Sequence, residues 1–420
     1  MRPVAARKGR DMAGTVLAVD ARSAGESQFG IEETFFSRTD ARGVIRAFND
    51  VFLRISGFDA GELRNAPHRI IRHPDMPRGV FQLLWDGIQA GYPVAAYVKN
   101  RAKDGRYYWV LALVTPREGG YLSVRMKPTS DLFHTVISEY AALATAERAE
   151  GLTPQQSAAR LLERLAQLGF ARYGAFQSRA LASELAAYDE AVRAQADGKM
   201  AAMLRLADQA TGIRALKAQV TADLQRLQLV PVNMRIISAR IERSGGPLGA
   251  IADNYRDLAG TVMRELNRLL SDAGAGSTFA MAGEEGALFL HGASRLMQMT
   301  EAQFSRQRVA HDGIDIGAER AELRALSQSY DAQAAESLII LARVAGRLVA
   351  DIGSLRRAIV ALDSIRIMSR VECGRTSQPH AGLASLITAL DGFHAGLDAH
   401  LYQIAGTAQS VRDEADLLGV

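Results

Sequence analysis

The run Pro67-His-Arg-Ile-Ile-Arg-His-Pro-Asp-Met-Pro77 carries the side chains most suited to chemistry. Arg72 can donate a fork of hydrogen bonds, while His73 and Asp75 can donate or accept. Trp85 follows shortly afterwards and offers a ring for stacking. Because proline fixes φ and removes a backbone donor, the run is expected to form short, stiff segments. It suits an anionic or polar planar ligand, and a well-capped surface turn accounts for the same residues equally well.

A mixed α/β segment, residues 29–130, is expected to position this run. Short helices are expected between Asp50 and Ile88, and Asp104-Gly105 is a hairpin signal. The expected strands cover residues 34–38, 44–48, 97–101, 107–114 and 121–126. This pattern predicts an α+β fold, an antiparallel sheet with helices on one face, and a ligand between the two.

Composition limits the function classes. A chain of 420 residues is expected to hold two or more units, and its net charge of +4 comes from interspersed acidic and basic residues. A nucleic-acid surface is therefore not indicated. The lone Cys373 excludes a disulfide framework and a cysteine zinc site. Charges interrupt the apolar stretch Leu338–Ile352, so no membrane span and a cytoplasmic location are expected, with residues 1–28 disordered.

Beyond residue 131 the pattern is helical to the end of the chain. Thr153 and Gln156 form a capping box around Pro154, and a single long helix is expected over Ala175–Leu229. Further helices are expected over residues 248–270, 287–308, 317–370 and 381–417, with a loop over 274–286. Length and composition favour a coiled coil or a helical bundle over a globular α domain.

Two bends are expected in this helical region, near residues 244–248 and 374–380. The segments before them, which begin at Met234 and Ile365, resemble each other: Met-Arg-Ile-Ile-Ser and Ile-Arg-Ile-Met-Ser. Two helical hairpins that arose by internal duplication explain this match, and chance similarity is the alternative.

Five features of the N-terminal segment occur together: Phe48-Asn-Asp-Val-Phe52, Ser56-Gly-Phe58, the Pro67–Pro77 run, Trp85, and Val98-Lys-Asn-Arg-Ala-Lys-Asp-Gly-Arg-Tyr-Tyr-Trp-Val110. On these features the segment resembles a PAS domain, more narrowly the flavin-binding PAS domain of bacterial aerotaxis receptors. The resemblance implies a non-covalently bound FAD that reports cellular redox state. It covers about a quarter of the chain.

The resemblance also implies which residues hold the cofactor. Arg72, His73 and Asp75 match the family's ligand-holding positions. Asn49, Trp85 and Asn100 match other positions that line the flavin site. Physically, the edge of an isoalloxazine ring offers carbonyl and N–H groups to asparagines, and an indole can stack on a ring of the cofactor.

The asparagine and histidine side chains also suit roles that need no flavin. Asn49 is equally suited to cap a helix that begins near Asp50. His68 and His73 offer ligands for haem, which some PAS domains bind. A photoreactive flavin–thiol adduct is excluded, because the segment has no cysteine.

The helical region resembles the signalling hairpin tip of methyl-accepting chemotaxis proteins. The residues that carry this are Asn233–Glu242 and Ala252-Asp-Asn-Tyr-Arg-Asp-Leu-Ala259, although the bend between them is about five residues shorter than in the family. The resemblance implies a chemotaxis kinase or its coupling protein as partner. The alternative is a generic amphipathic bundle. Helical bundles of this kind usually associate, so a homodimer or higher oligomer is expected.

Three functions compete on these grounds. The first is a redox or oxygen sensor, not an enzyme, that relays flavin state through the helical region. The second is a flavoenzyme, although neither a Rossmann fingerprint nor a nucleophile elbow is evident. The third is an adaptor whose PAS domain holds no cofactor.

Overall fold

Five strands form the antiparallel sheet that the sequence predicts, in the spatial order β2-β1-β5-β4-β3. The computed structural model describes residues 25–227, 232–233, 235–236, 247–271, 283–306, 313–375 and 381–419. The strands are β1 (Phe35–Asp40), β2 (Ile45–Phe48), β3 (Val94–Arg101), β4 (Tyr107–Arg117) and β5 (Gly120–Met126). Gly105 closes the predicted hairpin between β3 and β4 with a φ of 90°, a conformation that favours glycine.

The sheet separates two layers. Short elements between β2 and β3 cover one face, which we call the inner face: α1 (Asp50–Ser56), α2 (Ala60–Leu63), the 3₁₀ turn η1 (His68–Ile71) and α3 (Arg78–Gln89). The Pro67–Pro77 run therefore folds as one short turn followed by extended residues, and α3 begins directly after it. This is the stiff, short backbone expected from its prolines.

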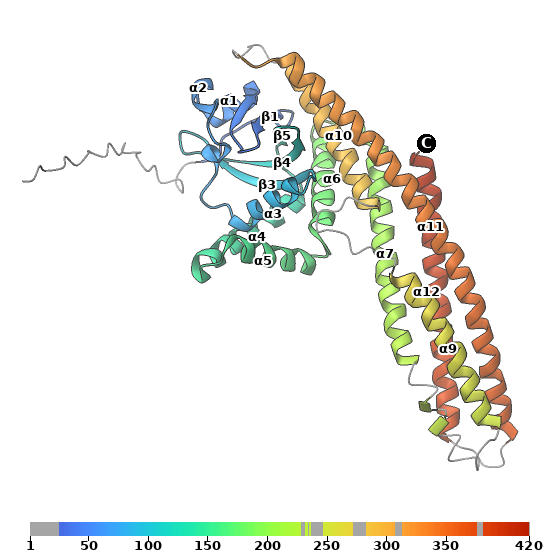
Figure 1. The fold of residues 1–420 in the computed structure, drawn as a ribbon. Helices are drawn as coiled ribbons and strands as arrows, with labels where there is room; N and C mark the ends of the chain where they lie inside the picture. The colour runs from blue at the N-terminus through green and yellow to red at the C-terminus, as the bar shows by residue number, and fades with distance from the viewer. Residues whose placement is uncertain are drawn as a thin grey trace, which may run out of the picture.

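Side chains of the strands alternate between the two faces. On β5, Ser123 and Arg125 point to the inner face, whereas Leu122 and Val124 point to the opposite, outer face. Helices from the C-terminal region cover the outer face (Figure 1).

That region is entirely helical where the structure describes it, so the predicted fold class is confirmed. Its helices are α4 (Asp131–Glu150), α5 (Pro154–Gln167), α6 (Tyr173–Ala191), α7 (Gly198–Leu227), α9 (Pro247–Ser271), α10 (Gly283–Ser305), α11 (Ile316–Arg375) and α12 (Ala381–Gly419). The capping box at the start of α5 forms as predicted: Thr153 Oγ1 accepts from the Gln156 N–H at 3.2 Å. Helices α7, α9, α11 and α12 run side by side as a long bundle that extends away from the sheet (Figure 1).

The prediction of one helix over Ala175–Leu229 is wrong. The chain forms α6 and α7, separated by residues 192–197, where Arg193 has a φ of 53°. The break follows from packing, because α6 lies against the edge strand β3 while α7 joins the bundle. Asp197 starts α7 by accepting from the Met200 N–H at 3.0 Å, and the Asp197-Gly198 pair is the sequence signal for this break.

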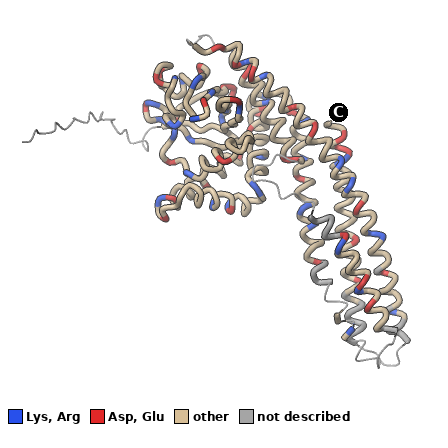
Figure 2. Tube along the Cα trace, viewed as in Figure 1, with Lys and Arg blue, Asp and Glu red and all other residues tan. Residues whose placement is uncertain are grey.

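Helix α11 connects the two parts of the molecule. It has 60 residues, which corresponds to about 90 Å at the helical rise. One end lies on the outer face of the sheet and the other lies at the far end of the bundle (Figure 1). Figure 2 shows that Lys and Arg are interspersed with Asp and Glu along these helices.

Several predicted features fall partly outside the described residues. These include residues 1–24, the bends at 244–246 and 376–380, most of the Asn233–Glu242 arm and residues 274–282 of the expected loop. Residues 283–286 of that loop belong to α10. Residues 25–28 differ from the expected disorder, because the Ser27 N–H donates to the Tyr107 carbonyl at 2.7 Å. Among the described residues, no helix is long and apolar enough to cross a membrane.

Candidate functional site

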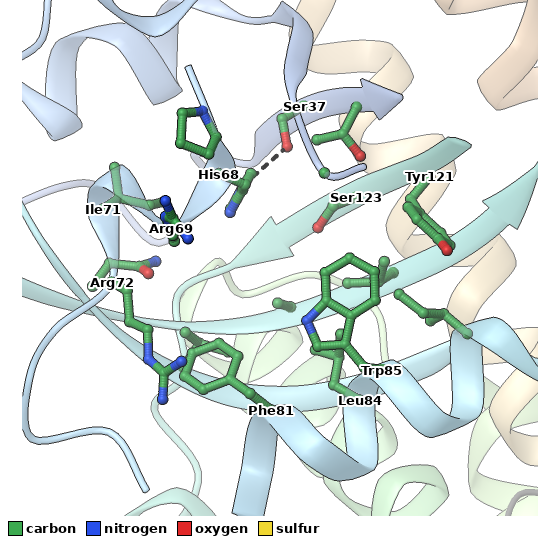
Figure 3. Close-up of a pocket in the computed structure, with 18 of the residues that line it drawn as sticks. Ser37, His68, Arg69, Ile71, Arg72, Phe81, Leu84, Trp85, Tyr121 and Ser123 are labelled. Carbon is green, nitrogen blue, oxygen red and sulfur yellow. Dashed lines mark hydrogen bonds between the residues drawn. The ribbon is translucent and has the colours of Figure 1, made fainter. Parts of the chain in front are cut away.

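A cavity of about 370 Å³ lies between the inner face of the sheet and the elements η1 and α3. Its size falls within the range of small-molecule sites. Figure 3 shows Ser37, Tyr121 and Ser123 on the strands, opposite the α3 side chains Phe81 and Trp85. Polar side chains of the sheet, among them Ser37 and Ser123, therefore share the cavity with the aromatic rings of α3.

Three of the six predicted site residues line this cavity: Arg72, Trp85 and Asn100. The Arg72 guanidinium stacks on the Phe81 ring, 3.9 Å from its centroid. Burial lowers the pKa of Arg72. Its guanidinium makes no hydrogen bond or ion pair with any described residue, so its donors can serve a ligand at the cavity.

Trp85 and Asn100 come from opposite walls. The Trp85 ring meets Tyr121 edge to face at 5.4 Å, which orients the indole on α3. Asn100 is buried on β3, where its backbone forms a bridge with Arg72. The Asn100 amide has no hydrogen-bond partner within the described part of the chain, so it too can serve a ligand.

Asn49 lies elsewhere, at the start of α1. Its side-chain oxygen accepts from the Phe52 N–H at 3.1 Å and from the Phe36 N–H at 3.0 Å, and its amide donates to the Thr34 carbonyl at 2.8 Å. Both ends of the side chain are therefore occupied in capping α1 and fixing β1. Asn49 thus takes the helix-capping role that its position before Asp50 also suits.

His73 and Asp75 also lie outside the cavity lining. His73 is buried, and its Nδ1 accepts from the Asp75 N–H at 3.1 Å. Burial and the nearby Lys99 lower the pKa of His73 to about 4, so the ring is neutral at pH 7. The Asp75 carboxylate pairs with Lys99 Nζ at 3.3 Å. Together these contacts hold the Pro67–Pro77 run against β3 and thereby position Arg72.

The structure adds a polar cluster that the sequence reasoning missed, centred on Arg125. Arg125 Nη2 donates to Ser37 Oγ at 2.8 Å and lies 2.6 Å from His68 Nε2. Burial and the Arg125 charge lower the pKa of His68 to about 3, so His68 is neutral and Nε2 accepts. Arg125 Nη1 and Ser123 Oγ are buried and find no hydrogen-bond partner among the described residues. The strict alternation of Tyr121-Leu-Ser-Val-Arg125 could have revealed this cluster, because it places the polar residues on one face.

Two buried carboxylates tie the walls of the site to the helical region. Glu147 of α4 accepts from the backbone N–H groups of Arg78 at 2.7 Å and Gly79 at 3.2 Å, which caps the helix that carries Trp85. A Cβ on Gly79 would lie 2.5 Å from Ser157, so α3 and α5 approach as closely as only glycine allows.

The second carboxylate, Glu184 of α6, is fully buried. It accepts from the Tyr97 hydroxyl at 2.8 Å, from the Thr129 N–H at 2.6 Å and from the Ser130 N–H at 3.0 Å. It therefore joins β3 to the start of α4 through α6.

Helix α11 contacts the outer face directly. The Arg38 guanidinium binds Glu319 at 2.6 Å, and the Tyr330 hydroxyl donates to Thr115 Oγ1 at 3.1 Å. Arg38 lies between Ser37 and Thr39, which both line the cavity. Neighbouring residues on one strand thus reach the cavity and α11.

Comparison with known proteins agrees with this geometry. Residues 45–123 match the family described as the PAS fold. Over 117 residues the chain is 40% identical to the aerotaxis receptor of Escherichia coli (strain K12), a stretch that is 27% of this chain and 23% of the receptor. The nitrogen fixation regulatory proteins of Klebsiella pneumoniae and Klebsiella oxytoca are 32% and 31% identical over 80 residues, which are 19% of this chain and 16% of each.

The N-terminal domain is therefore a PAS domain. Its sequence is of the aerotaxis-receptor type, as the resemblance predicted. The chain spans less than a quarter of the length of the curated relatives that it matches.

Proposed function

We propose that this protein is a cytoplasmic redox or oxygen sensor, not an enzyme, whose PAS domain binds FAD. The observation that carries the proposal is the cavity itself. On the sheet it presents two buried donors that have no hydrogen-bond partner among the described residues, Arg125 Nη1 and Ser123 Oγ, and it presents a tryptophan on the wall opposite. The similar proteins are named as a receptor and as a regulatory protein, which favours sensing over turnover.

The residues present fit a flavin. Bound FAD would supply a ring system that takes up electrons and protons reversibly. Arg72 and Asn100 would donate to acceptor atoms of the cofactor, and Trp85 would pack on a ring face. Haem fits these side chains less well, because His68 Nε2 is already engaged by Arg125 and His73 lies outside the cavity lining.

The contacts on the outer face of the sheet suggest how a signal would leave the cavity. A change in hydrogen bonding at the cavity would shift β1 and β5, and α11 contacts β1 through Arg38 and Glu319. The continuous helix would carry that shift along the bundle. We propose that the far part of the bundle acts on a chemotaxis kinase, its coupling protein or a related signalling partner, with the protein as a homodimer or higher oligomer.

An absorbance spectrum of the purified protein tests the cofactor. We expect the two-banded spectrum of a flavin, either as isolated or after incubation with FAD, and release of FAD on denaturation. A Soret band would replace flavin with haem. A colourless protein that takes up no FAD would favour an adaptor, and steady oxidation of a reduced nicotinamide would favour a flavoenzyme.

A further inference from the structure

Arg125 is the most unusual charge in the cavity. The residue is only 3% exposed, and no carboxylate pairs with it in the described part of the chain. Burial lowers its pKa to about 10, so it keeps its positive charge at neutral pH. Its guanidinium lies over the Phe52 ring, 5.2 Å from the centroid, and its Nη2 contacts are the neutral acceptors Ser37 and His68.

A buried charge of this kind is costly without compensation, typically by several kcal/mol. On neighbouring strands, Arg38 and Arg117 each pair with a carboxylate of α11, Glu319 and Glu322 respectively. Arg125 instead faces the hollow, and its Nη1 has no partner among the described residues. A ligand with a carbonyl-rich edge would supply the missing acceptor, and a negatively charged edge would supply it best.

We propose that Arg125 makes the site sensitive to redox state by binding the carbonyl edge of the flavin ring more strongly when that edge is negatively charged. This rests on the proposed function, since it assigns a residue to the flavin. A neutral ring that accepts two electrons and one proton from a two-electron donor carries one negative charge. Arg125 gains an ionic partner in that state, so it favours the reduced cofactor and raises its midpoint potential.

The test measures FAD binding to the apoprotein twice, once in air and once under anaerobic dithionite. In Arg125→Gln the charge is removed while a hydrogen-bonding group remains. We expect its affinity for the reduced cofactor to fall about tenfold more than its affinity for the oxidised cofactor, since a charge-assisted hydrogen bond is at stake. That ratio corresponds to a midpoint potential lower by about 30 mV for a two-electron couple.

Arg38→Gln is the matched control, because it removes an arginine from the other face of a strand that pairs with β5. We expect it to leave the ratio of the two affinities unchanged. Equal losses for both redox states in a folded Arg125→Gln protein, including complete loss of both, would overturn the proposal.

A second variant keeps the proposal testable if Arg125→Gln does not fold. If circular dichroism shows that Arg125→Gln is unfolded, Arg125→Lys keeps the charge and should retain most of the preference for reduced FAD. Loss of that preference in a folded lysine variant that still binds FAD would overturn the proposal. A wild-type protein that binds FAD in neither state would instead overturn the proposed function, and this proposal with it.

Discussion

The two faces of the PAS sheet differ in what they contact: the inner face borders a cavity, and the outer face packs against helices. The inner face surrounds a hollow with polar groups that lack partners among the described residues, such as Arg125 Nη1 and Ser123 Oγ. On the outer face, helices pack against the strands: Phe304 packs on Phe36, and Glu319 pairs with Arg38. The difference indicates that one face is shaped for a ligand and the other for the rest of the chain.

Adjacent residues of a single strand serve the two faces. On β1, Ser37 and Thr39 line the cavity while Phe36 and Arg38 reach α10 and α11. No separate linker is needed to carry a change from the cavity to the bundle. If signals pass this way, substitutions on the inner face should affect FAD binding and substitutions on the outer face should affect stability. A change in the cavity should still alter the helices on the outer face.

The largest effect is expected from Glu184→Ala, on the outer side. The substitution removes the acceptor of the buried Tyr97 hydroxyl and of the Thr129 and Ser130 N–H groups. We expect the free energy of unfolding to fall by about 3 kcal/mol or more. Chemical denaturation followed by circular dichroism measures this. The exposed Glu190→Ala on the same helix is the control, and an equal loss in both would contradict the assigned role of Glu184.

The next effect is a pH dependence that belongs to the inner face. The pKa of His68 is lowered to about 3 in the folded protein, against 6.5 for an ordinary histidine. Protonation therefore favours the unfolded chain, and this contribution to stability is full above pH 6.5 and is lost as the pH falls toward 3. By pH 5 the loss should be about 2 kcal/mol, and His73 adds to it in the same direction.

Melting curves between pH 7 and pH 5 measure this loss. In His68→Gln the curve should flatten, because the titrating group is gone. The exposed His134→Gln should melt as the wild type does at every pH. A pH dependence that is unchanged in His68→Gln would show that His68 is not held neutral.

The two tryptophans of the chain separate the faces most cleanly, since Trp85 lines the cavity and Trp109 packs on Phe133 at 5.5 Å on the outer face. We expect Trp85→Ala to weaken FAD binding about tenfold, the typical worth of a stacked ring, with little change in apoprotein stability. Trp109→Ala should lower the stability of the apoprotein and change FAD affinity little. Fluorescence titration with FAD and thermal melts of both variants give the comparison, and identical profiles would contradict a division between the faces.

The smallest effect is expected from Tyr330→Phe, which removes the hydrogen bond from α11 to Thr115. Stability should fall by about 1 kcal/mol, measured by denaturation. FAD affinity should stay the same, because Thr115 points away from the cavity. A clear loss of FAD binding would show that α11 shapes the cavity itself.

The sequence predicted the PAS domain well because its signals are local. Alternating strands, the Asp104-Gly105 turn and the prolines each act within a few residues, and all formed as expected. The capping box at Thr153 is equally local, and it too was confirmed. The break between α6 and α7 was missed because it depends on where α6 packs, on β3, which lies far away in sequence.

The site was predicted in part for the same reason. Arg72, Trp85 and Asn100 reach the cavity, whereas the roles of His73, Asp75 and Asn49 in binding stay predictions. Arg125 was missed because its lack of a carboxylate partner among the described residues is a property of the packed sheet, which no short segment encodes.

The central claim is that the state of the cavity reaches α11 through the sheet. Hydrogen–deuterium exchange of the FAD-bound protein, oxidised and then reduced with dithionite, tests it most directly. We predict that exchange changes on reduction in β1, β5 and the α11 segment Ile316–Tyr330, while α5 changes little. Exchange that changes around the cavity but stays the same across that segment of α11 would contradict the account.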